Sequence, residues 1–175
     1  VVLRYPSTYP LATTTTGSNN VAMGWAALYS NTTGSSNTAV GYQSGYNNTI
    51  GINNSVLGYQ AFYSNTTGVG CVAVGYQALY AHTTGNNNTA VGQNSSKAVT
   101  FGIQNTTMGW GSMQTNTTGS GNVAIGYSAL SGATYGNNNV AIGLAALQTA
   151  DGLNNTTAVG YAAMQLTTTG ANNTA

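Results

Sequence analysis

Few side chains in this sequence could carry out acid–base, nucleophilic or metal chemistry. The 175 residues include one carboxylic acid, one histidine, one cysteine and two cations, which are Asp151, His82, Cys71, Arg4 and Lys97. Acid–base catalysis requires titratable groups held close together, and a protein metal site requires several ligands. We therefore expect a protein without enzymatic activity, without a cofactor and without a metal.

Each of these residues has a simpler interpretation. His82 stands in a polar turn, and we expect it to be a solvated loop residue. Cys71 takes a place that asparagine usually fills, and we expect a tolerated buried substitution, since free cysteine behaves as a small hydrophobe. Arg4 and Lys97 are interpreted as isolated surface charges.

Asparagine-linked glycosylation is the covalent modification for which the sequence offers acceptors. Asn-x-Ser/Thr triplets begin at eleven positions, and five of them are our candidate sites: Asn31, Asn47, Asn65, Asn105 and Asn116. A chain rich in Asn and Thr also produces such triplets by chance. However, Asn31, Asn65 and Asn116 share one place in a repeated turn that we expect to be exposed. Glycans there would help to keep the chain soluble.

The elements that position these residues follow from a 17-residue repeat. One glycine column has this spacing along the chain: Gly24, Gly41, Gly58, Gly75, Gly92, Gly109, Gly126, Gly143 and Gly160. A fixed short period defines a repeat architecture. We predict one array over residues 17–175, preceded by an extended segment of residues 1–16 that could connect subunits.

Each repeat carries a short strand pattern around its glycine. The residue before the glycine is apolar, the one before that is usually Ala, and the one after is mostly Tyr or Trp. This alternation, followed by a second apolar position and a polar "SNTTG" turn, is typical of a strand and a turn. We predict an all-β parallel β-solenoid, or β-roll, of about ten coils. A helical repeat fits less well because Gly, Thr and Asn are poor helix formers, although a helical turn at "YQAL" stays open.

Stacked coils explain why the sequence varies so little. Coils spaced about 4.8 Å apart would place each residue on its counterpart. A ladder of asparagines is predicted at Asn20, Asn37, Asn54, Asn88, Asn105, Asn122 and Asn139. Each amide could donate to one neighbouring coil and accept from the other. Charges would stack like on like, which is unfavourable, and only 2% of the residues are charged.

The same composition excludes several partners. Two cations cannot neutralise a track of phosphates, so we expect no nucleic acid partner. No apolar run approaches the roughly 18 residues of a membrane helix, so we expect no membrane insertion.

The phrases "NTAVGYQ", "NVAIGYSAL" and "NVAIGLAAL" resemble the head repeats of trimeric autotransporter adhesins. Related arrays occur in phage tail-fibre and surface proteins. The resemblance implies a left-handed parallel β-roll with three chains side by side on a displayed stalk. It also implies an extracellular, cell-surface or virion-surface location.

These observations favour an extracellular structural fibre or shaft, such as an adhesin, tail-fibre or filament subunit. Its partner would be itself, in a homotrimer or a head-to-tail filament. One alternative is an ice-binding solenoid that uses the threonine columns. Another is an adhesin that binds cell-surface glycans with the aromatic column, although such a column is also typical of simple packing.

Overall fold

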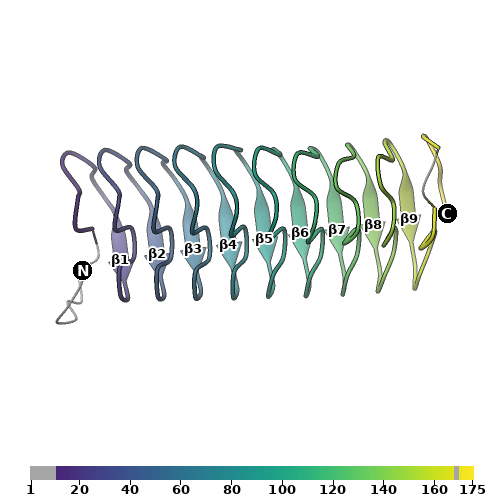
Figure 1. Ribbon diagram of the computed structural model, residues 1–175, viewed down its shortest axis with the longest axis horizontal. Helices are drawn as coiled ribbons and strands as arrows, with labels where there is room; N and C mark the ends of the chain where they lie inside the picture. Colours follow the sequence, from purple (N-terminus) through teal and green to yellow (C-terminus); the bar gives the residue numbers. More distant parts are fainter. Residues whose placement is uncertain (1–10, 168–169) are drawn as a thin grey trace.

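The computed structural model describes residues 11–167 and 170–175 of the chain. These residues form nine three-residue strands in one parallel sheet, whose spatial order is the order of the sequence (Figure 1). The strands are β1 (Val21–Met23), β2 (Thr38–Val40), β3 (Ser55–Leu57), β4 (Val72–Val74), β5 (Thr89–Val91), β6 (Thr106–Met108), β7 (Val123–Ile125), β8 (Val140–Ile142) and β9 (Thr157–Val159). The predicted all-β parallel solenoid is confirmed.

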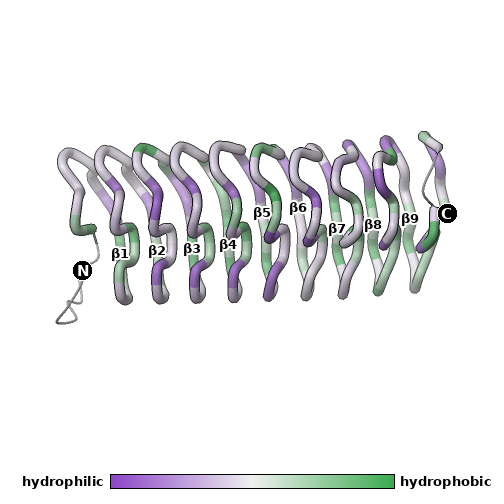
Figure 2. Tube along the Cα trace, viewed as in Figure 1, coloured by the Kyte–Doolittle hydropathy of each residue, from purple (hydrophilic) through white to green (hydrophobic). Residues whose placement is uncertain are grey.

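Residues paired in neighbouring strands are 17 positions apart in the sequence, which is the period of the repeat. In β4 and β5, Val72 pairs with Thr89 and Val74 pairs with Val91, which is a step of 17 residues. The same step relates every neighbouring pair of strands, so the hydropathy pattern recurs from coil to coil in Figure 2. Slipping one residue would turn every inward side chain outward, so the strict period fixes this pairing.

The alternation within each strand puts small residues inside and larger ones outside. Ala73 is fully buried at the centre of β4, whereas Val72 and Val74 on either side are half-buried. Successive side chains of a strand point to opposite faces. Because a coil of 17 residues encloses little space, alanine suits its inner wall.

The glycine after each strand allows neighbouring coils to approach closely. Gly75 has a φ of +129°, and a Cβ built on it would lie 2.6 Å from the carbonyl oxygen of Gly92. Residues with a side chain rarely adopt this φ, and the backbone of the next coil leaves no space for one. Glycine is therefore required where the strand passes into the turn.

The "YQAL" segment forms a left-handed turn pattern rather than a helix. Gln77 and Leu79 have φ angles of 52° and 50°, in the left-handed region. The amide of Gln77 donates to Tyr59 in the preceding coil (2.9 Å), and that of Leu79 donates to Ser95 in the following coil (3.1 Å). The turn thus bonds to both neighbours, which offsets the left-handed cost of about 1–2 kcal/mol per residue.

The core is a narrow column of apolar side chains with a few polar interruptions, the largest of them near β6. Phe62, Leu79, Met113, Leu130 and Leu147 are among its largest buried members. At β6 the column changes to hydroxyl groups: Ser95 lies 2.8 Å from Thr107 and 2.9 Å from Ser112, and Ser96 lies 2.9 Å from Thr107. Since these buried hydroxyls bond to one another, the interruption does not leave them unsatisfied.

The first described residues already bond to the coil that follows them. The amide of Leu11 donates to the carbonyl of Ala27 (3.1 Å), and that of Thr15 donates to Thr32 (2.9 Å). Residues 11–16 are therefore bonded to the following coil like the later turns. The rest of the proposed connector, residues 1–10, lies outside the described residues.

Candidate interaction surface

The titratable and nucleophilic residues are spread along the array. Among the described residues, no group of three His, Cys, Asp or Glu side chains lies close enough together to hold a metal ion. His82 and Cys71 are buried in the interior, whereas Asp151 is exposed. Each of them makes local contacts that are structural in kind.

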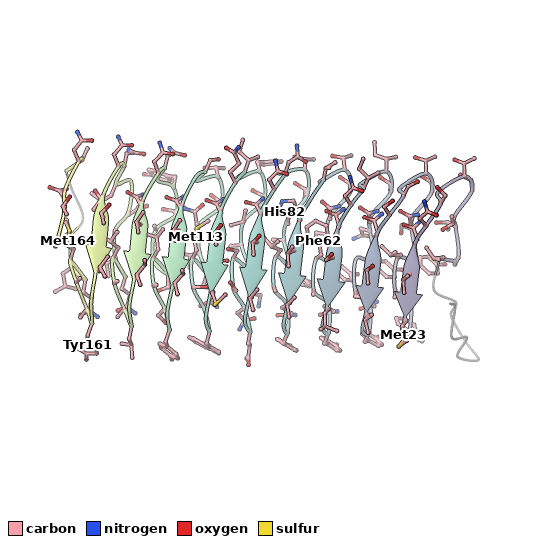
Figure 3. The ribbon with its side chains drawn as sticks, turned by 180° about the vertical axis from the view of Figure 1, so that it is seen from behind. Met23, Phe62, His82, Met113, Tyr161 and Met164 are labelled. Atoms are coloured by element: carbon pink, nitrogen blue, oxygen red, sulfur yellow. The ribbon has the colours of Figure 1, made fainter. Side chains whose placement is uncertain are left out.

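His82 is buried, so the expectation of a solvated loop residue was wrong. Its Nδ1 lies 3.2 Å from Oδ1 of Asn65, and its Nε2 lies 3.1 Å from Nδ2 of Asn88. The ring stacks on Phe62 with centroids 4.9 Å apart (Figure 3 labels both). An amide oxygen only accepts and an amide nitrogen only donates, so the neutral ring carries its proton on Nδ1. Burial lowers the pKa of His82 to about 4.

Cys71 is buried, as expected for a tolerated substitution. Its sulfur lies 3.7 Å from the carbonyl oxygen of Gly85, and its amide donates to Oδ1 of Asn54 (2.9 Å). Burial raises the pKa of the thiol to about 11. The nucleophilic thiolate is therefore scarce at neutral pH.

Asp151 and Lys97 each complete a local contact. Asp151 accepts hydrogen bonds from the hydroxyl and the amide of Thr134, and the hydroxyl bond is the main cause of its lowered pKa. The Nζ atom of Lys97 lies 5.9 Å from the centroid of the Tyr80 ring. Each contact is made to the residue 17 positions earlier, in the neighbouring coil.

The predicted asparagine ladder bonds mainly to backbone atoms of one neighbouring coil. Oδ1 of Asn37 accepts from the amide of Asn54 (3.0 Å), and Nδ2 of Asn37 donates to the carbonyl of Gly51 (2.8 Å). Both partners belong to the following coil, which differs from the expected donation to one side and acceptance from the other. The side chain therefore satisfies one backbone amide and one backbone carbonyl of the turns, which have no partner in a strand.

A second asparagine column forms the amide-to-amide ladder. Nδ2 of Asn48 donates to Oδ1 of Asn31 (2.8 Å), and Nδ2 of Asn65 donates to Oδ1 of Asn48 (2.6 Å). The polar composition of the turn predicted an exposed column, and sequence reasoning therefore missed this ladder. The available signal was the replacement of asparagine by Val99 in the same column, since an apolar residue there indicates a buried position.

This second column corrects the expectation for the glycosylation candidates. Asn31, Asn65 and Asn116 are fully buried and Asn105 nearly so, whereas Asn47 is half-buried. The "SNTTG" turn folds its asparagine inward, where the side chain bonds the turn backbone. The expected exposed position was wrong for the first three, and the packed interior leaves no space for a glycan on any of these four buried side chains.

Aromatic side chains form stacked columns on the outside. Trp25, Tyr42, Tyr59 and Tyr76 stack with centroids 4.7, 5.0 and 5.3 Å apart. A second column, which sequence reasoning missed, contains Tyr29, Tyr46, Tyr63 and Tyr80 at 5.2 to 5.3 Å. Within each column the ring faces cover one another, so mainly the ring edges meet the solvent.

The largest candidate surface is the outer side of the sheet. We define the strand face as the first and third residues of β1–β9 together with the residue after each following glycine. Leu57 and Met108 on this face are each 50% exposed, and Tyr127 is 52% exposed. Met23 and Tyr161, from opposite ends of the array, lie along the same side in Figure 3. The strand face contains no charged residue.

No family model, no curated protein and no solved structure matches the chain. Within the residues that the structure describes, no helix is long and apolar enough to cross a membrane. The function is therefore argued from the array and its strand face.

Proposed function

We propose that the chain is a non-catalytic structural element of an extracellular fibre or shaft, which displays a surface and associates with copies of itself. The observation that carries this proposal is the unbroken register of the array. Each of the nine strands pairs with its neighbours at the same residues, and the turns and ladders keep the same step. This regularity suits a scaffold, since it repeats one surface along the whole length of the array.

The array is built to resist extension along its axis. Backbone hydrogen bonds run from coil to coil, as from Gly92 to Val74 (2.7 Å) and from Thr83 to Thr100 (3.0 Å). The hydroxyl of Thr83 adds a bond to the same carbonyl of Thr100 (3.1 Å). At about 4.8 Å per coil, the nine strands span about 38 Å. Repetition of such coils sets the length of a shaft.

The resemblance to adhesin head repeats and tail-fibre arrays supports the same proposal. Those proteins place a repeated strand-and-glycine phrase on an extended, surface-displayed stalk. A cell-surface or virion-surface location would follow from it, and so would assembly with further copies.

Two other functions fit the geometry less well. Sugars stack on the faces of aromatic rings, but the faces of Tyr42 and Tyr59 are covered by neighbouring rings. Ice binding would need a regular rank of free threonine hydroxyls. The hydroxyls of Thr66 and Thr83 donate to carbonyls of the next coil. The neighbouring exposed threonine column is interrupted by Ile50, Phe101 and Tyr135.

Electron microscopy of the negatively stained, purified chain tests the proposal. We expect elongated particles, with a long axis that includes the span of the nine strands and with association between copies. Compact, round particles would contradict a role as a fibre or shaft.

A further inference from the structure

We propose that two copies of the chain pair face to face through the strand face. This inference rests on the proposed function and deepens it by naming the surface and the partner. The partner is a second copy, and the pairing leaves the turn columns exposed for display.

The composition of the strand face differs from that of the other exposed columns. Its third-residue column contains only apolar side chains: Met23, Val40, Leu57, Val74, Val91, Met108, Ile125, Ile142 and Val159. The column formed by the residue after each glycine is mostly aromatic, and its members Tyr76 and Tyr127 are about half exposed. In contrast, the exposed column before the second glycine of each repeat is mainly threonine, as at Thr33, Thr84 and Thr118. The first-residue column of the strand face mixes valine with threonine and serine, as at Val72, Thr38 and Ser55. Among the described residues, the strand face is therefore the surface with an unbroken apolar column, which runs along its third residues.

The size of the strip meets the requirement of a stable pair. Its length is about 38 Å for nine strands, and the three residues of each strand together with the large side chain beyond the glycine give a width of about 16 Å. These dimensions correspond to about 600 Å² on each copy and about 1,200 Å² for the pair, above the roughly 1,000 Å² expected of a specific interface. An apolar strip of this size lies at the upper end of what monomeric proteins expose, and such patches often mark interaction sites.

The strip is complementary to itself in charge and in spacing. Because it carries no charged residue, two copies meet without repulsion and without a desolvated charge. The ridges of side chains on one copy recur at the strand spacing, so an identical copy presents ridges and grooves of the same period. A partner with a different repeat would fit only over a short distance.

The number of copies follows from the number of apolar faces. The resemblance to the adhesins implies three chains side by side, in which each chain contacts two others. Here one sheet carries the apolar strip, and a single identical sheet packed about 10 Å away can cover all of it. A closed two-fold pair therefore removes the exposed strip completely.

The molar mass of the chain in solution tests this inference. One chain has a mass of 17.7 kDa, so size-exclusion chromatography with light scattering should give 2 × 17.7 = 35.4 kDa. Leu57→Glu and Met108→Glu each place a carboxylate in the paired strip, and each should reduce the mass to that of one chain. Both side chains point outward, so the circular dichroism spectrum should stay unchanged.

Phe101→Glu is the matched control, because Phe101 is 61% exposed but belongs to the threonine column outside the strip. This variant should remain a pair. A wild-type mass of one or three chains would overturn the inference, and so would a Leu57→Glu variant that stays folded and paired. If the glutamate variants lose their fold, an uncharged double variant, Leu57→Ser with Met108→Ser, tests the inference instead. It should raise the dissociation constant of the pair at least tenfold, and a smaller change would overturn the inference. Elongated particles with the mass of one chain would reject the pairing and the self-association, but would leave the role as a structural shaft standing.

Discussion

Oδ1 of Asn65 lies 3.2 Å from Nδ1 of His82, one coil further along the array. The only histidine of the chain thus takes the place of an asparagine in a buried ladder. Its other ring nitrogen accepts from Asn88. The ring is buried and neutral in the folded array, whereas an exposed imidazole takes up a proton in weak acid. The stability of the array therefore depends on pH.

Acid should destabilise the array through His82. Burial lowers its pKa from 6.5 to about 4, so between these values the unfolded chain binds the proton more tightly than the folded chain. This contribution to stability is complete above about pH 6.5 and is lost as the pH falls toward 4, by about 3 kcal/mol in total. Urea unfolding at pH 7 and pH 4 measures the loss. His82→Asn should remove most of the pH dependence, and equal wild-type stability at both pH values would contradict the account.

Replacing Cys71 with asparagine should stabilise the array. In the other coils, asparagine at this place donates to a glycine carbonyl and accepts from a backbone amide, as Asn37 does. Cys71→Asn would restore both bonds, toward Gly85 and Asn88, and should add about 1–2 kcal/mol to the free energy of unfolding. Chemical denaturation against a Cys71→Ala control measures the gain. A variant no more stable than Cys71→Ala would show that the ladder bonds contribute little.

Replacing Val99 with asparagine should also stabilise the array. Nδ2 of Asn116 is buried and has no hydrogen-bond partner among the described residues, because Val99 stands where the ladder would supply an oxygen. A buried unpaired donor costs about 1–3 kcal/mol. Val99→Asn should recover about 1 kcal/mol in thermal or urea unfolding. Loss of stability as large as that of a Val99→Ala control would contradict the proposed ladder.

Gly75→Ala should destabilise the array by about 3 kcal/mol or more, because strain at its φ adds to overpacking against a backbone. The added Cβ would lie 2.6 Å from the carbonyl oxygen of Gly92. The control is Gly111→Ala, where φ is +61° and the nearest atom, 3.2 Å away, ends the flexible side chain of Gln114. Unfolding curves should show a loss of only about 1 kcal/mol for the control. Equal losses in the two variants would mean that close approach of the coils is unimportant.

The period made the fold predictable. A 17-residue step that keeps Gly75 and Gly92 aligned leaves one register for a stacked sheet, and the alternation around Ala73 defines its inner face. These features depend on residue type and spacing, which the sequence shows directly.

The direction of the turn side chains was not predictable in this way. Left-handed residues such as Gln77 and Leu79 alternate with right-handed ones, so no simple period decides which side chains point inward. Asparagine occurs in exposed and buried turns alike, and for this reason the burial of Asn31 and His82 was missed. The stacked column of Tyr46 and Tyr63 was missed because the alternating pattern ends before it.

The coil-to-coil register is the central claim, and NMR couplings across hydrogen bonds test it most directly. A long-range HNCO spectrum of the labelled chain detects the carbonyl that accepts from each amide. The account predicts a coupling from the Gly92 amide to the Val74 carbonyl, and likewise from Gly75 to Leu57 and from Gly58 to Val40. Couplings of these glycine amides to carbonyls at any other sequence separation would contradict it.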